Sequence, residues 1–159
     1  MIEQRKLAAI DIGSNAVRLL IMTVTEQEGK EPLFKKTSLV RVPIRLGADV
    51  FISKVISEEN TTRMVDTMQA FKLLMKSHKI EAYQACATSA MREANNGQEI
   101  ANLIEKETGV TIQIIDGNHE AAIIAATDLH ALIQQDKTYL YVDVGEVVQS
   151  LHYIAVGKP

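Results

Sequence analysis

Four clusters of polar side chains stand directly after apolar stretches that have the character of buried strands. The clusters lie at residues 11–15, 88–96, 116–120 and 143–146. In open α/β sheets, ligands bind beyond the carboxyl ends of the strands, so clusters that follow strands can share one edge of a sheet. Each cluster alone fits an ordinary turn or a solvated surface. Their repeated position favours a common site.

The residue types in these clusters suit the transfer of a phosphoryl group to water. Gly13 lets backbone N–H groups approach an anion closely, and Ser14 and Asn15 add hydrogen-bond donors. Arg92 can bind a phosphate through two parallel hydrogen bonds. Glu120 is suited to orient and deprotonate the attacking water.

Two aspartates extend this chemistry to a metal ion. Asp11 and Asp143 each end an apolar stretch, and each precedes a glycine by two residues. Carboxylate oxygens are the ligands that Mg²⁺ prefers, and Mg²⁺ usually keeps several of its waters. The two aspartates are therefore expected to hold Mg²⁺ through water molecules.

The hydrophobic pattern predicts the elements that must position these residues. Strands are expected at 7–12, 17–25, 32–42, 80–87 and 110–115, and helices at 57–78, 96–108 and 119–134. The first three strands should form an antiparallel meander, with an irregular link at 44–56 and a polar loop at 88–96. The order βββαβαβα indicates an α/β domain with a mixed five-stranded sheet.

The last part of the chain repeats the opening pattern of a strand, an Asp-x-Gly turn and a second strand. The two strands are expected at 138–144 and 147–156. We therefore expect one domain at 1–136 and, at 137–159, the first hairpin of a truncated or absent second domain. A hairpin this apolar needs a partner, which is either its own sheet or a second copy of the chain in a homodimer.

Composition restricts the class of protein. The chain has 159 residues and a net charge of −3, and the absence of a basic stripe argues against nucleic-acid and anionic-membrane partners. Asp11 and Arg18 interrupt the first apolar stretch, which excludes a signal peptide there and leads us to expect a cytoplasmic protein. The single cysteine, Cys86, lies in an apolar stretch that indicates a buried structural thiol.

The sequence resembles the exopolyphosphatase/guanosine pentaphosphate phosphohydrolase (Ppx/GppA) family, which belongs to the sugar kinase/heat-shock-70/actin superfamily. Residues 9–19 resemble the family's first phosphate motif, residues 87–95 its arginine-bearing loop, and residues 115–121 the segment that ends in the catalytic glutamate. The resemblance implies a ribonuclease-H-like (actin-like ATPase) fold. It also implies Mg²⁺-dependent hydrolysis of terminal phosphates from polyphosphate or guanosine pentaphosphate.

The resemblance assigns roles to individual residues. Arg92 matches the phosphate-binding arginine and Glu120 the general base, although the residue before Glu120 is His119 where the family usually has a second glutamate. The remaining matches are Asp11, Gly13, Ser14 and Asn15 in the first phosphate loop, Gly145 in the second, and Asp143 as the metal- or water-binding aspartate.

One departure from the family pattern leaves alternatives open. The second phosphate motif usually continues with two glycines and a serine, whereas Glu146, Val147 and Val148 stand here. A catalytically inactive homologue that binds phosphate or nucleotide, or acts as a scaffold, is therefore an alternative to the phosphohydrolase. An ATP-using kinase of the same superfamily is a third possibility, but the Arg92 and Glu120 segments fit the phosphohydrolase pattern better.

Overall fold

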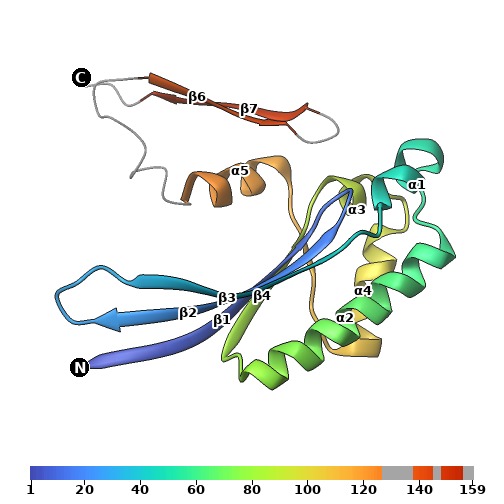
Figure 1. Ribbon diagram of the computed structural model, residues 1–159. Helices are drawn as coiled ribbons and strands as arrows, with labels where there is room; N and C mark the ends of the chain where they lie inside the picture. Colours follow the sequence, from blue (N-terminus) through green and yellow to red (C-terminus); the bar gives the residue numbers. More distant parts are fainter. Residues whose placement is uncertain (127–137, 145–147, 156–159) are drawn as a thin grey trace. The chain divides into compact units, whose positions relative to one another are not determined.

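A computed structural model describes residues 1–126, 138–144 and 148–155 of the chain (Figure 1). The chain forms two compact units, Met1–Ile114 and Ile115–Pro159, and each is described by itself. The division of the sequence into domains at residue 136 stays a prediction.

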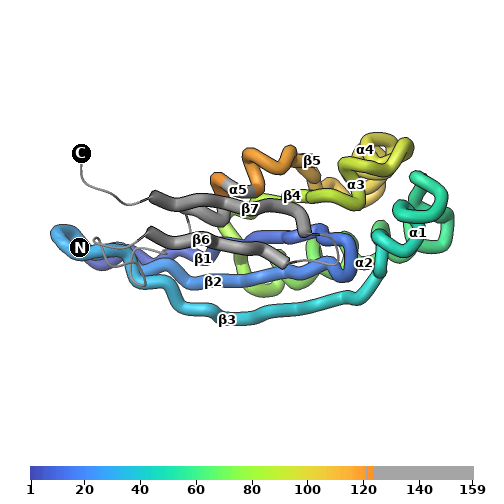
Figure 2. Tube along the Cα trace, turned by 90° about the horizontal axis from the view of Figure 1, so that it is seen from above, coloured from blue at the N-terminus to red at the C-terminus, as the bar shows by residue number. Residues whose placement is uncertain are grey.

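The first unit is built on a five-stranded mixed sheet. Its strands are β1 (Ile2–Ile12), β2 (Val17–Gln27), β3 (Leu33–Val42), β4 (Ala82–Ala87) and β5 (Gln113–Ile114). They lie in the order β3-β2-β1-β4-β5, and Figure 2 shows the first four side by side. The β1–β2 and β2–β3 pairs are antiparallel, while β1–β4 and β4–β5 are parallel. The expected meander and the mixed five-stranded sheet are both confirmed.

The strand register aligns the carboxyl ends of four strands at one edge, which we call the carboxyl edge. Ile12 of β1 pairs with Ala87 of β4, and Ala87 pairs with Ile114 of β5. The strand β3 runs in the same direction, because it is antiparallel to β2, and its last residue Val42 lies opposite Val17. Segments that follow these strands therefore emerge at a common edge.

Four helices accompany the sheet in this unit, namely α1 (Leu46–Ser53), α2 (Glu58–His78), α3 (Ser89–Glu93) and α4 (Gly97–Thr108). Helices α2 and α4 cover one face of the sheet (Figure 1). On that face the buried residues include Ile10, Ile12, Met68, Phe71 and Ile104. Because side chains alternate along a strand, Leu7, Ala9 and Asp11 point to the opposite face, which we call the open face.

Two helix ends lie at the residues that the sequence pattern predicts. The side chain of Ser57 caps α2 by accepting a hydrogen bond of 3.3 Å from the backbone N–H of Asn60. The helix α4 ends at Gly109, which has φ 72°, a conformation that glycine adopts at little cost.

Three local expectations need correction. The segment 44–56 was expected to be irregular, but it contains α1; the expected loop 88–96 contains α3; and β5 occupies only two of the residues expected at 110–115. The helix α1 lacks a side-chain cap, and it starts after Arg45 in the left-handed region. It forms because Leu46 and Val50 are buried in the core, a tertiary cause that local propensity does not reveal.

The second unit contains the helix α5 (Gly117–Ala126) and the hairpin β6 (Thr138–Val144) and β7 (Val148–Ala155). The helix begins two residues before the expected start, and residues 127–134 of the expected helix lie outside the described residues. The strands β6 and β7 form a two-stranded sheet with each other. The expected pairing of the hairpin, with the five-stranded sheet or with a second copy of the chain, stays a prediction.

Among the residues that the structure describes, every helix is too short or too polar to cross a membrane.

Candidate active site

The turn between β1 and β2 is the first part of the site. The backbone N–H of Gly13 donates to the carbonyl of Ala16 at 3.1 Å and closes the turn. A Cβ at position 13 would meet that carbonyl at 3.5 Å, which is an ordinary contact. The fold itself therefore tolerates a side chain there, and the role of Gly13 in a close backbone approach to a ligand stays a prediction. Asn15 is exposed at the tip of the turn, and Ser14 is partly buried.

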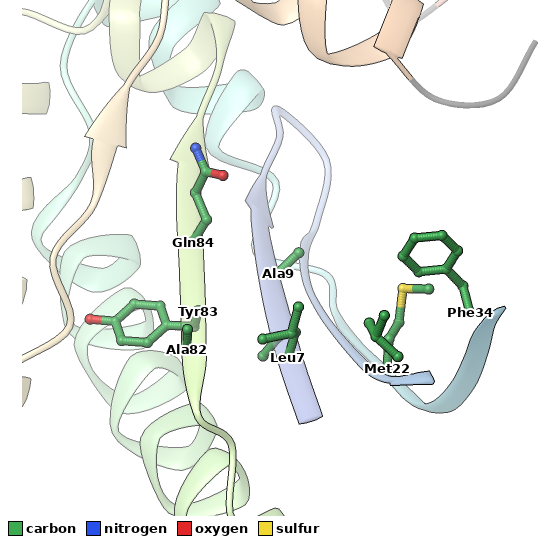
Figure 3. Close-up of a pocket in the computed structure, with 9 residues that line it drawn as sticks. Leu7, Ala9, Met22, Phe34, Ala82, Tyr83 and Gln84 are labelled. Atoms are coloured by element: carbon green, nitrogen blue, oxygen red, sulfur yellow. The ribbon is translucent and has the colours of Figure 1, made fainter. Parts of the chain in front are cut away.

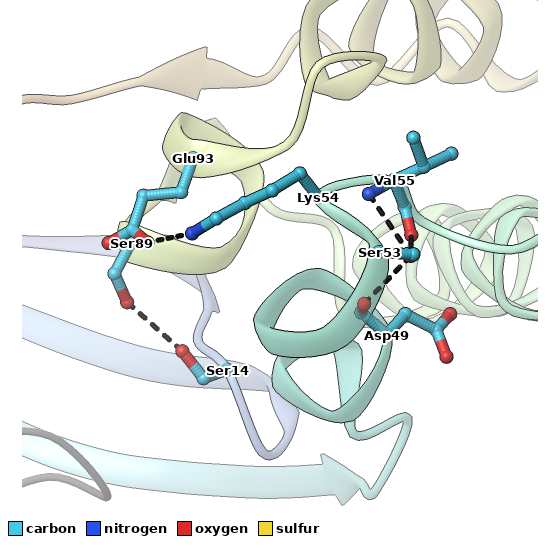
Figure 4. Close-up of polar contacts among 7 residues, drawn as sticks. All are labelled: Ser14, Asp49, Ser53, Lys54, Val55, Ser89 and Glu93. Atoms are coloured by element: carbon cyan, nitrogen blue, oxygen red, sulfur yellow. Dashed lines mark hydrogen bonds and ion pairs between the residues drawn. The ribbon is translucent and has the colours of Figure 1, made fainter.

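The turn is joined to the helix that carries Arg92. The hydroxyl oxygens of Ser14 and Ser89 are 3.0 Å apart and share a hydrogen bond (Figure 4). The backbone N–H of Thr88 donates to the carbonyl of Ile12 at 3.1 Å, which continues the β1–β4 pairing past the strand ends. Arg92 lies on α3 with an exposed side chain. The structure thus brings two of the predicted clusters together at the carboxyl edge.

The helix α1 supports the same turn from the other side. The backbone N–H of Gly47 donates to the carbonyl of Ser14 at 2.8 Å, and that of Arg45 donates to the carbonyl of Asn15 at 3.0 Å. A Cβ on Gly47 would lie 3.1 Å from the Cβ of Ser14. The sequence prediction missed this support. The signal that could have revealed it is that residues 43–47 also follow a strand that ends at this edge.

The helix α3 is fixed in place by several contacts. The side-chain amide of Asn96 accepts from the backbone N–H of Ile56 at 3.0 Å and donates to its carbonyl at 2.9 Å. Lys54 lies 3.5 Å from the carboxylate of Glu93 (Figure 4). Gly97 lies so close to the backbone of Met91 that a Cβ would be 2.0 Å from the Met91 carbonyl oxygen. These contacts hold the α3 backbone that carries the arginine.

Asp11 lies on the open face, between a positively charged neighbour on β2 and an uncharged neighbour on β4. Its carboxylate is 3.6 Å from the guanidinium of Arg18 on β2, and Cys86 of β4 is its partner on the other side. Partial burial raises the pKa of Asp11, and the Arg18 charge opposes that rise. Burial also raises the pKa of the Cys86 thiol, and the negative charge of Asp11 adds to the effect. Cys86 is half-buried, not fully buried as expected, and a raised pKa argues against a nucleophilic role.

The other predicted site residues belong to the second unit. Glu120 lies in the first turn of α5. The side chain of Asp116 caps this helix by accepting from the backbone N–H of His119 at 2.8 Å, and the backbone N–H of Glu120 donates to the Asp116 carbonyl at 3.0 Å. Asp143 is in β6, but its side chain lies outside the described residues, as does all of Gly145.

Metal ligands are sparse in the part of the chain that the structure describes. Within it, no three His, Cys, Asp or Glu side chains gather as they do around a metal ion. Asp11 is one carboxylate at the turn, and the nearby Arg18 already offsets its charge.

The open face also contains a hollow of about 400 Å³. Its lining includes Leu7, Ala9, Met22, Phe34 and Gln84 (Figure 3). The lining is mostly apolar, which does not suit a phosphate. The chemistry of the first unit is therefore concentrated at the carboxyl edge.

Comparisons with known sequences match this chain to a family of phosphatases. The model of the Ppx/GppA phosphatase family matches residues 21–147. Exopolyphosphatase 1 of Mycobacterium tuberculosis is 28% identical to this chain over 118 residues, which are 74% of this chain and 33% of that protein. The chain thus spans about a third of the length of the relative that it matches.

Solved structures agree with the fold. An exopolyphosphatase from Cytophaga hutchinsonii is similar with a TM-score of 0.77 and 28% identity, covering 89% of this chain and 44% of that one. The Aquifex aeolicus PPX-GPPA enzyme is similar with a TM-score of 0.65 and 28% identity, covering 74% and 38% of the two chains. These similarities agree with the α/β fold that was expected, and its ribonuclease-H-like class stays what the family resemblance implies.

Proposed function

Because the chain belongs to the Ppx/GppA phosphatase family, we propose that it hydrolyses the terminal phosphate of inorganic polyphosphate or of guanosine pentaphosphate. One observation carries the proposal. The anion-binding turn and the arginine helix are joined at the carboxyl edge by the 3.0 Å contact between Ser14 and Ser89. A preformed turn next to an arginine is a phosphate site that needs little reorganisation on binding.

In the proposed reaction, the terminal phosphate lies against the turn. Backbone N–H groups near Gly13, the hydroxyl of Ser14 and the amide of Asn15 donate hydrogen bonds to its oxygens. Arg92 binds the same group and offsets the charge that develops in the transition state. Holding the phosphate in one orientation lets a water molecule approach in line with the bond to be broken.

Glu120 has the role of general base in this proposal. Water attacks the terminal phosphorus, its proton passes to the Glu120 carboxylate, and the bridging P–O bond breaks. The products are orthophosphate and a chain shortened by one phosphate. Glu120 lies in the first turn of α5, where a negative charge interacts favourably with the partial positive charge of the helix N-terminus.

Mg²⁺ remains part of the proposal. Asp11 and Asp143 would hold the ion through water molecules, and the ion would offset phosphate charge. The fit is incomplete in the described part of the chain, where Arg18 already stands beside Asp11. No step above depends on the ion.

We also propose that the hairpin β6–β7 begins a second domain of the same kind, as its Asp-x-Gly repeat indicates.

A second candidate function is phosphate or nucleotide binding without turnover. The observation that favours it is the sequence Glu146-Val147-Val148, which replaces small residues of the second phosphate motif with a carboxylate and two β-branched side chains. A negative charge there would repel a polyanion.

The test is phosphate release from polyphosphate and from guanosine pentaphosphate with Mg²⁺, for the wild-type chain and for Glu120→Gln. We expect the variant to lose activity by roughly 10²–10⁴-fold. Glu99→Gln is the matched control, since Glu99 is also an exposed acid in a first helical turn, and it should leave the rate unchanged. Equal rates for wild type and Glu120→Gln would refute the role of Glu120. Binding measured by calorimetry without any turnover would favour the second candidate.

A further inference from the structure

Arginines are concentrated at the carboxyl edge. The chain has six arginines, and four of them lie at or next to this edge: Arg18, Arg41, Arg45 and Arg92. The concentration is local, because the chain as a whole has a net charge of −3. Only Arg92 was expected to bind phosphate, so the function of the others needs an explanation.

Two of these arginines face each other across strands. Arg41 of β3 pairs with Arg18 of β2, and Arg18 pairs with Asp11 of β1. Directly opposed like charges destabilise a sheet. Asp11 lies 3.6 Å from Arg18 and can offset only that charge. Arg41, Arg18 and Asp11 thus form a row across three strands, and Arg41 adds a positive charge at its end.

Arg45 is held in an unusual backbone conformation beside the turn. It has φ 63° and ψ 46°, in the left-handed region that favours glycine or asparagine. Its backbone N–H donates to the Asn15 carbonyl at 3.0 Å. The guanidinium of Arg63 donates to the carbonyls of Pro43 at 2.8 Å and Ile44 at 3.2 Å, which fixes the preceding segment. The structure thus keeps an arginine where a glycine would be less strained.

Both side chains are available to a ligand. Arg41 and Arg45 are exposed, and within the described part of the chain neither guanidinium takes part in an ion pair or a side-chain hydrogen bond. An exposed guanidinium with five free donors is suited to bind phosphate in bidentate fashion.

We propose that Arg41 and Arg45 form a subsite that binds phosphate groups beyond the one that is cleaved. This inference rests on the proposed function, because it assumes that the terminal phosphate lies at the turn of Gly13, Ser14 and Asn15. Arg45 is tied to that turn through Asn15, and the row of Arg41, Arg18 and Asp11 reaches it along the open face. The ligand class is a chain of linked phosphates, supplied either by inorganic polyphosphate or by the phosphates of guanosine pentaphosphate.

The experiment measures binding by calorimetry to the full chain. The probes are orthophosphate, a long-chain sodium polyphosphate and guanosine pentaphosphate. Arg41→Gln and Arg45→Gln should each weaken long-chain polyphosphate binding by roughly tenfold, and leave orthophosphate binding within about twofold. Guanosine pentaphosphate should follow long-chain polyphosphate if its outer phosphates reach the subsite, and orthophosphate if they do not.

Two further variants separate ligand binding from structure. Lys36→Gln removes one positive charge from the far end of β3 and should bind like wild type. Arg45→Gly relaxes the backbone while it removes the side chain, so it should be no less stable than wild type and yet lose the same affinity as Arg45→Gln.

The outcomes are distinct. Long-chain binding that is unchanged in both arginine variants overturns the subsite and leaves the proposed function standing. Equal weakening in Lys36→Gln also overturns it, because general charge would then explain the effect. If wild type binds none of the three probes, the subsite and the proposed function both fail.

Discussion

Gly97→Ala tests whether the α3–α4 contact positions the arginine helix. The new Cβ would lie 2.0 Å from the carbonyl oxygen of Met91 and 3.0 Å from its carbonyl carbon. To reach an ordinary separation of 3.4 Å, the two backbones must part by about 1.4 Å. Met91 is buried at 1% exposure, so the displacement disturbs the core and moves the neighbouring Arg92.

The expected cost is about 2 kcal/mol of unfolding free energy, as for other overpacked sites. This corresponds to a Tm lower by roughly 4–8 °C for a domain of this size. Helix propensity alone would predict the opposite sign, because alanine is the better helix former. A shift of about 1 Å at Arg92 should also lower phosphate release by roughly a hundredfold.

Thermal unfolding and phosphate release from polyphosphate measure the two effects. Gly117→Ala is the matched control, since it lies at the start of another helix and a Cβ there meets nothing within 4 Å. It should be neutral or slightly stabilising. A Gly97→Ala protein with the wild-type Tm and activity would refute the reasoning, because it would show that α3 tolerates displacement.

Three further predictions concern the surroundings of the site. Burial raises the pKa of Asp11, so the stability that this group contributes is present at low pH and lost as the pH rises through its folded pKa. Asp11→Asn should remove this loss in urea unfolding at several pH values, and an unchanged pH dependence in the variant would contradict the prediction. Hydrogen bonds from the hydroxyl and the backbone N–H of Ser57, and from Asn60, lower the pKa of Asp49. The contribution of Asp49 to folding stability is therefore present at neutral pH and lost as the pH falls through its folded pKa. Asp49→Asn should lower the free energy of unfolding by about 1 kcal/mol at pH 7, discounted for exposure, and should leave it unchanged in strong acid. Asn96→Ala leaves the backbone N–H and carbonyl of the buried Ile56 without these partners and should cost about 2–3 kcal/mol in chemical denaturation, whereas a cost near zero would show that water replaces the amide.

The sequence predicted the elements whose signals are local. Ser57 and Gly109 mark the start of α2 and the end of α4, and alternation along β1 separates the face of Ile10 from that of Asp11. The sequence could not predict α1, because no cap or strong propensity announces it. Its formation depends on the burial of Leu46, which is zero per cent exposed, against residues far away in the chain.

The site was predicted in part for the same reason. The turn of residues 11–15 and Arg92 could be paired because each directly follows a strand, and parallel strands end together. The support from Gly47 and the cross-strand opposition of Arg18 and Arg41 depend on strand register. Register arises from long-range pairing, so it could not be inferred from either segment alone. The roles of Glu120, Asp143 and Gly145 stay predictions.

The pairing of Cys86 with Asp11 has a practical consequence for oxidation. The thiolate is the form that attacks disulfides and peroxides, and burial together with the Asp11 charge disfavours it here. Since Cys86 is the chain's one sulfhydryl, covalent dimers should form slowly in air. Labelling of Cys86 by a thiol reagent should therefore be slow at neutral pH, and the label would report on the surroundings of Asp11.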